Sequence, residues 1–176
     1  MARIVKGRQT VVFEGDFVVF MIGMRVNKPW KVWKWFSVAR AMRSMLDELS
    51  SDPESGLLGY RQLFGNPFAP EIVQYWRSFE HLERFARAKD RTHHPAWVRF
   101  NKAIGTSGDV GIWHETYLVR AGEYEVLYNG MPPHGLGKAG KLVPASGNYR
   151  SAAGRLGRAT GNGSAPAEAA ADAVSR

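Results

Sequence analysis

The 176-residue chain contains no cysteine. Disulfide bonds, thiolate zinc sites, iron–sulfur clusters and cysteine nucleophiles are therefore excluded. Long apolar runs are also missing, because the run at residues 17–24 is too short for a membrane-spanning helix and no signal-peptide pattern follows it. We therefore expect a cytoplasmic protein without a transmembrane segment, in which a hydrophobic core holds the fold.

Acidic residues are missing from two stretches, 17–46 and 126–167, although the chain as a whole has a formal charge of +8. Basic residues in both stretches favour nonspecific contact with anions, but no nucleic-acid-binding module accompanies them, so we expect no specific nucleic-acid partner. Phosphate-binding motifs are missing too: Gly135 to Lys138 lacks the Walker spacing, and there is no Rossmann fingerprint. The adjacent pair His93 and His94 lacks further ligands at suitable spacing, so no metal site is expected.

Hydrophobic patterning predicts the order strand, helix, strand, strand, helix, strand, strand. The strands are expected at residues 17–26, 56–64, 71–79, 110–119 and 123–128, the first helix over 30–50, and a second helical region in two pieces, around 82–86 and 95–104. This order predicts an α+β fold, a ferredoxin-like βαββαβ unit with an extra strand. The strand at 17–26 is apolar on both faces, so we expect two copies to pair as a dimeric α+β barrel that encloses a cavity.

The domain is expected to span residues 10–156. Within it, residues 129–137 are rich in glycine and proline and predict a long ordered loop, and residues 149–156 predict a short helix. Residues 157–176 consist mostly of alanine, glycine and serine, which is typical of a disordered tail.

The first helix combines an apolar stripe with a basic, tryptophan-rich start. The stripe is expected to contain Val32, Trp35, Phe36, Ala39, Met42, Leu46 and Leu49. Trp30 and Trp33 lie beside it, next to lysines. Such a segment can cover the border of a hydrophobic core, contact a dimer partner or bind a membrane surface.

The strand at 110–119 carries the best candidates for chemistry. Because side chains alternate along a strand, His114 shares one face with Ile112 and Thr116, whereas Glu115 shares the other with Trp113 and Tyr117. His114 can act as a general base near neutral pH, and Glu115 can hold a proton or orient a base. We expect one of the two to face a cavity and favour His114.

Other residues complete the candidate site. Arg25 can stabilise an oxyanion or a carboxylate and is our third catalytic candidate. The residues expected to bind a flat apolar substrate are Trp76, Trp113, Tyr117, Tyr128 and Met131.

Four segments of the chain resemble a little-studied bacterial and fungal family whose namesake is the polyketide monooxygenase of fumagillin biosynthesis. They are residues 75–80 (YWRSFE), 111–117 (GIWHETY), 122–125 (GEYE) and 131–133 (MPP), within a resemblance that covers roughly residues 15–154. The resemblance implies a dimeric α+β barrel fold and an oxidative role on a small molecule. His134 departs from the apolar or aromatic residue expected at its position.

The resemblance favours a monooxygenase-like enzyme that acts without a cofactor on an apolar, aromatic or polyketide-type substrate. Two alternatives stay open. Haem could bind in the barrel, because one axial histidine is enough to hold it. The protein could instead be a non-enzymatic ligand-binding or membrane-peripheral protein.

Overall fold

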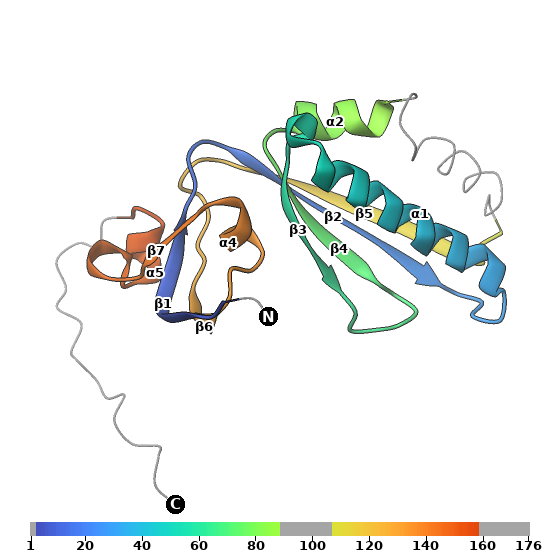
Figure 1. Ribbon diagram of the computed structural model, residues 1–176, viewed down its shortest axis with the longest axis horizontal. Helices are drawn as coiled ribbons and strands as arrows, with labels where there is room; N and C mark the ends of the chain where they lie inside the picture. Colours follow the sequence, from blue (N-terminus) through green and yellow to red (C-terminus); the bar gives the residue numbers. More distant parts are fainter. Residues whose placement is uncertain (1–2, 89–106, 159–176) are drawn as a thin grey trace, which may run out of the picture.

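The larger of two sheets carries the ferredoxin-like part of the fold. The structure is a computed structural model that describes residues 3–88 and 107–158. In this sheet β2 (Phe17–Val26), β3 (Leu57–Leu63), β4 (Glu71–Trp76) and β5 (Val110–Val119) lie in the order β3-β4-β2-β5, and every neighbouring pair is antiparallel. The two main helices, α1 (Val32–Ser51) and α2 (Phe79–Arg87), pack on the same face (Figure 1). The expected α+β class and βαββαβ order are confirmed.

Packing between α1, α2 and the sheet forms a core on this helix-covered face. Val18 and Trp76 from the strands meet Leu49 from α1 and Leu82 and Phe85 from α2, and all five are buried. The even-numbered residues of β2 and β4 supply this face, and the odd-numbered residues point to the helix-free face.

The apolar stripe of α1 differs in part from the sequence prediction. Leu46 and Leu49 are buried as expected, but Val32 and Phe36 are 49% and 57% exposed. Val38, which was not part of the predicted stripe, is buried instead. The first half of α1 therefore does not close completely onto the sheet.

A glycine turn after α1 directs the chain into β3. Gly56 has φ +81°, in the left-handed region that disfavours other residues. A Cβ atom here would also meet the ring of His81 at 2.4 Å. Gly56 thus lets the start of α2 pack against the start of β3.

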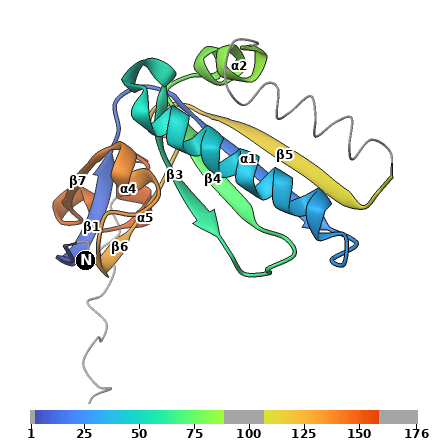
Figure 2. The ribbon, with the colours of Figure 1, turned by 45° about the vertical axis from the view of Figure 1, so that its right-hand side comes forward.

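A second, three-stranded sheet lies beside the larger one. It has the order β6-β1-β7, formed by β1 (Val5–Val12), β6 (Tyr128–Met131) and β7 (Lys141–Pro144). The short helices α4 (Leu136–Ala139) and α5 (Ala152–Arg155) accompany it (Figure 2). The apolar residues shared between the two sheets are Val11, Phe17, Val73, Tyr75 and Leu136. Part of the helix-free face is therefore covered by the same chain.

Several expectations for the last third of the chain were wrong. Residues 123–127 form no strand, and the supplementary strand is β6, in the smaller sheet. Residues 129–137 are not an irregular loop, because they contain most of β6 and the start of α4. The helix expected at 149–156 is reduced to α5 and a preceding 3₁₀ turn. The helical piece expected at 95–104 lies outside the described residues, as does the tail beyond residue 158.

A close approach on the helix-free face gives a first testable prediction. Gly23 pairs with Trp113 across β2 and β5, and a Cβ atom at Gly23 would lie 2.7 Å from the indole ring. We expect Gly23→Ala to lower the free energy of unfolding by about 1–3 kcal/mol, because the indole must move out of its packed position. Urea denaturation followed by circular dichroism measures this change.

Gly111→Ala is the matched control for this substitution. Gly111 also lies in a strand of the larger sheet, but a Cβ atom added there would meet nothing within 4 Å. We expect its unfolding free energy to stay within about 0.5 kcal/mol of the parent. Equal effects of the two substitutions would contradict the role of the Gly23–Trp113 contact.

Candidate functional site

Strand β5 separates the two strongest candidates as alternation requires. His114 pairs with Ile22 and Glu115 with Met21, so the imidazole points to the helix-covered face and the carboxylate to the helix-free face. The ring of His114 lies beside that of Phe20, with centroids 5.6 Å apart. His114 and Glu115 therefore cannot act on the same atom of one bound molecule.

His114 lines a cavity of about 340 Å³ between the larger sheet and the helices, which we name the Trp76 cavity. Its described lining residues come from β2, β4, β5, α1 and α2 and are mainly apolar. The polar side chains among them include Gln74, Glu83, His114 and Thr116. The cavity thus offers an apolar volume with few polar groups, as small-molecule sites commonly do.

Trp76 forms the buried wall of this cavity. Its side chain is fully buried, and its Nε1 donates a hydrogen bond to Oε1 of Gln74 at 2.8 Å. Both side chains come from β4, two residues apart, and so share the helix-covered face. Of the expected substrate-binding residues, Trp76 is the one that shares a cavity with His114.

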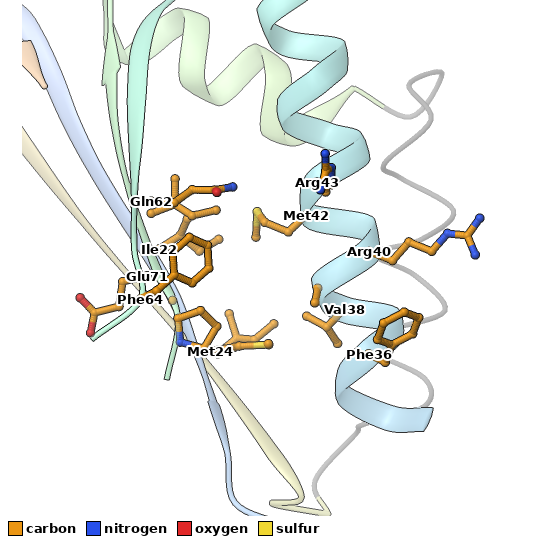
Figure 3. Close-up of a pocket in the computed structure, with 15 residues that line it drawn as sticks. Ile22, Met24, Phe36, Val38, Arg40, Met42, Arg43, Gln62, Phe64 and Glu71 are labelled. Atoms are coloured by element: carbon orange, nitrogen blue, oxygen red, sulfur yellow. The ribbon is translucent and has the colours of Figure 1, made fainter. Parts of the chain in front are cut away.

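A second cavity, of about 420 Å³, adjoins the first nearer the start of α1, and we name it the Phe36 cavity. The two share Ile22, Val38, Met42 and Ile112 as lining residues. Figure 3 shows Val38 and Met42 extending from α1 toward the sheet, whereas Arg40 points away from it. The loose packing of the first half of α1 leaves this space.

The helix-free face holds the other candidates from β2 and β5. The hydroxyl of Tyr117 donates to the carboxylate of Glu115 at 2.6 Å, and this hydrogen bond raises the pKa of Tyr117. Tyr117 is 51% exposed, and Arg25 is also exposed. Trp113 lies on this same face against Gly23. These four residues are separated from His114 by the sheet itself.

Tyr128 and Met131 belong to the smaller sheet. The Tyr128 hydroxyl accepts a hydrogen bond from the backbone N–H of Gly137 at 3.1 Å, and burial raises the pKa of this tyrosine. Its ring packs against the core between the sheets. Met131 is 39% exposed. Neither lines the two cavities described above.

A buried carboxylate forms ion pairs with three lysines around the start of α1. Asp109 is 1% exposed, and its oxygens lie 2.8, 2.8 and 2.5 Å from the Nζ atoms of Lys28, Lys31 and Lys34. The three ammonium groups hold the pKa of Asp109 far below its usual range. Half of the basic residues in the acid-free stretch 17–46 therefore pair with one buried carboxylate. Trp30 and Trp33 beside them stay 68% and 70% exposed, and membrane binding by this segment remains a prediction.

The Asp109 cluster predicts how stability changes in acid. A carboxyl group whose pKa is depressed by folding stabilises the protein above its unfolded pKa, near 4, and loses this contribution as the pH falls further. We expect Asp109→Asn to lower the urea midpoint at pH 7 and to weaken its decline between about pH 4 and pH 2. Asp47→Asn, at an exposed position of α1, should change neither. Equal acid declines in parent and Asp109→Asn would refute this role.

Gln74 and Asp109 were not among the residues predicted from the sequence. A polar residue in the middle of the apolar strand β4 is the signal that could have revealed Gln74. Asp109 carries no comparable signal, since its partners lie 75 to 81 residues away in the chain.

Two further expectations concern metals and membranes. Among residues 3–88 and 107–158, no group of three or more histidine, aspartate or glutamate side chains could hold a metal ion. The pair His93 and His94 lies outside this described part. No described helix is sufficiently long and apolar to cross a membrane.

Known proteins similar to this chain agree with its fold. Monooxygenase af470 of Aspergillus fumigatus is 27% identical over 157 residues, which cover 78% of this chain and 56% of the relative, so the chain spans about half the length of that curated protein. A crystal structure of aldoxime dehydratase superposes with a TM-score of 0.62 at 19% identity, over 82% of this chain and 45% of the other. A structure of aldoxime dehydratase in complex with butyraldoxime superposes with a TM-score of 0.57 at 16% identity. This match covers 86% of this chain and 43% of the other.

The structural likeness supports the α+β fold, and the sequence comparison supports the family. The profile of the monooxygenase af470-like family matches residues 17–136, from the start of β2 to the start of α4. This range contains the whole βαββαβ unit and both cavities. The chain therefore belongs to the monooxygenase af470-like family.

Proposed function

We propose that the protein is a monooxygenase-like enzyme that oxidises a small apolar or aromatic molecule in the Trp76 cavity. The observation that carries this proposal is the imidazole of His114, an ionisable group that lines a mainly apolar cavity under the helices. Membership of a family named for a monooxygenase favours oxidative chemistry for such a site. The proposed activity needs no bound cofactor.

In the proposed reaction, His114 acts as a general base. It removes a proton from an acidic carbon of the substrate, and the resulting carbanion transfers electrons to dioxygen to form a peroxide. Elimination of water from this peroxide converts the CH₂ group into a carbonyl group. One oxygen atom of O₂ enters the product and the other leaves as water, so the substrate is the only reductant.

The cavity lining supports an apolar substrate. Aromatic and aliphatic side chains make up most of the lining and can pack against an apolar molecule. Trp76 and Phe20 give the cavity aromatic walls on which a flat substrate can stack. Arg25, Glu115 and Tyr117 take no part in this proposal, because they lie on the opposite face of the sheet.

Oxygen isotopes test this proposal directly. Chelator-treated protein is incubated under ¹⁸O₂ with a panel of bicyclic ketones that have acidic CH₂ groups next to the carbonyl. We expect one ¹⁸O atom per product molecule and oxygen uptake above that of heat-denatured protein. Uptake equal to this control across the panel would reject the proposal for these substrates.

Haem binding is the second candidate function, and the donor set in the cavity favours it. His114 could hold the haem iron, and Arg43 lines the adjoining cavity with a charge suited to a propionate group. Haem would supply redox chemistry at its iron. A Soret shift on hemin titration that is lost in His114→Ala would favour this candidate, and an unshifted spectrum would exclude it.

We also infer that two copies pair through the uncovered part of the helix-free face. Tyr117 and Glu115 are exposed there, and the smaller sheet covers only the part around Val73 and Tyr75. Light scattering coupled to size exclusion measures the mass of the assembly. A mass of about twice 19.6 kDa would support pairing, and a monomer mass at all concentrations would exclude it.

A further inference from the structure

Gln74 is a buried amide in which only one of the two polar side-chain atoms makes a hydrogen bond. The residue is 1% exposed, and its Oε1 accepts a hydrogen bond from the indole N–H of Trp76. This bond fixes the orientation of the amide, because only the oxygen can accept from an N–H donor. Its Nε2 has no hydrogen-bond partner within the described part of the chain.

An unpaired buried amide N–H₂ group is less favourable than a paired one, because it has lost its hydrogen bonds to water. Gln74 lies in the middle of β4 between Ile72 and Trp76 on the same face, where an apolar residue would complete the core. Because Gln74 lines the Trp76 cavity, a molecule that enters this cavity can reach the Nε2 group. The unsatisfied donor therefore indicates a hydrogen-bond acceptor in the ligand.

The register of the sheet places Gln74 relative to His114. Gln74 and Thr116 both pair with Phe20, from β4 and β5, and His114 pairs with the next residue on this face, Ile22. Two strand spacings, about 10 Å, separate β4 from β5. A fused two-ring molecule can thus lie on Phe20 and Ile22 with one end toward Gln74 and the other toward His114.

The charges around the cavity define the acceptor further. Its described lining residues include one carboxylate, Glu83, and no lysine or arginine. Burial of an anionic ligand without a cationic partner is unfavourable, so a neutral oxygen fits this position better than a carboxylate. Carbonyl oxygens meet this requirement.

We propose that Nε2 of Gln74 donates a hydrogen bond to a carbonyl oxygen of the ligand, so that the Trp76 cavity selects bicyclic ketones. This proposal rests on the proposed function only in placing the substrate in the same cavity. Gln74 is a specificity-determining residue in this arrangement, and Trp76 positions it through the indole N–H.

A cycle between two ligands and two protein variants tests the hydrogen bond. Dissociation constants of 1-tetralone and of tetralin, which lacks the carbonyl, are measured by ¹H–¹⁵N NMR titration of the full chain and of Gln74→Met. Methionine keeps the length and shape of the side chain but cannot donate. Comparing both ligands in both proteins removes their different hydration from the result.

We expect Gln74→Met to weaken 1-tetralone binding about five- to tenfold, the effect of one hydrogen bond, without weakening tetralin binding. The Gln74 amide protons, identified by their absence from the variant spectrum, should shift downfield with the ketone only. Thr116→Val, which removes another polar group from the cavity, should leave the ratio of the two dissociation constants unchanged.

Three results would overturn the proposal: equal weakening of both ligands, no weakening of either, or no binding of either up to its solubility limit. Because Gln74→Met also leaves the indole N–H of Trp76 without its acceptor, the variant Gln74→Met/Trp76→Phe is measured alongside it. Ketone-specific weakening without ¹⁸O incorporation would keep this inference while the oxygenase proposal fails. Incorporation of ¹⁸O, with equal effects of Gln74→Met on both ligands, would keep the oxygenase proposal while this inference fails.

Discussion

Replacing His114 with phenylalanine is expected to lower the rate of oxygen-dependent substrate turnover by about two to four orders of magnitude. General bases contribute this much when they are positioned at the reacting atom. Phenylalanine keeps a ring beside Phe20 but cannot accept a proton. The comparison is made on kcat and kcat/KM for a substrate identified by ¹⁸O incorporation, and over a range of pH.

Glu115→Gln is the matched control for His114→Phe. The two residues are adjacent in β5 and both exposed, but Glu115 points to the helix-free face. Its substitution should change turnover by less than about threefold, since it removes only a negative charge beside Tyr117 on the face opposite the cavity. A larger loss of turnover in Glu115→Gln than in His114→Phe would place the reaction on the other face of the sheet.

Truncation of Trp76 should produce the largest loss of stability in the protein. Substitution with alanine removes a fully buried indole that contacts Phe85 and donates to Gln74. Large-to-small changes of buried aromatic residues cost about 3–5 kcal/mol, because they combine lost apolar burial with a cavity that relaxes only in part. Urea unfolding of Trp76→Ala should therefore show a much lower midpoint, with a slope close to that of the parent.

Trp33→Ala makes the same chemical change at a surface position. Trp33 is 70% exposed on the first turns of α1. We expect its free energy of unfolding to stay within about 0.5 kcal/mol of the parent. If Trp33→Ala is as destabilising as Trp76→Ala, then the start of α1 is packed against a partner in solution.

Local patterns were sufficient to predict the ferredoxin-like unit. The strand at 110–119 was predicted with the bounds that β5 has, and the hairpin of β3 and β4 follows from two short strand-like runs around a proline-rich turn. In each case the pattern is formed by residues that are neighbours in sequence. Alternation along β5 also predicted correctly that His114 and Glu115 point to different faces.

The smaller sheet could not be predicted in the same way, because the strands that pair in it are distant from one another in sequence. Tyr124, Val126 and Tyr128 do pack together against the core between the sheets, as their spacing indicates. Their backbone is held differently from a strand: the Tyr124 hydroxyl accepts from the N–H of Phe13, and the carbonyl of Val126 accepts from Thr10. The alternating pattern therefore predicted correctly that these three side chains share a face, but the strand inferred from it at 123–127 does not form.

The place of β1 between β6 and β7 has a consequence for the order of folding. Its pairing partners, Tyr128–Met131 and Lys141–Pro144, follow it by more than 110 residues. Contacts of such high sequence separation form late, after the entropy of a long loop has been overcome. During synthesis on the ribosome, β1 emerges before β6 and β7 and must remain unpaired while the βαββαβ unit folds from neighbouring segments. The smaller sheet then closes last, and its formation joins the two ends of the folded region.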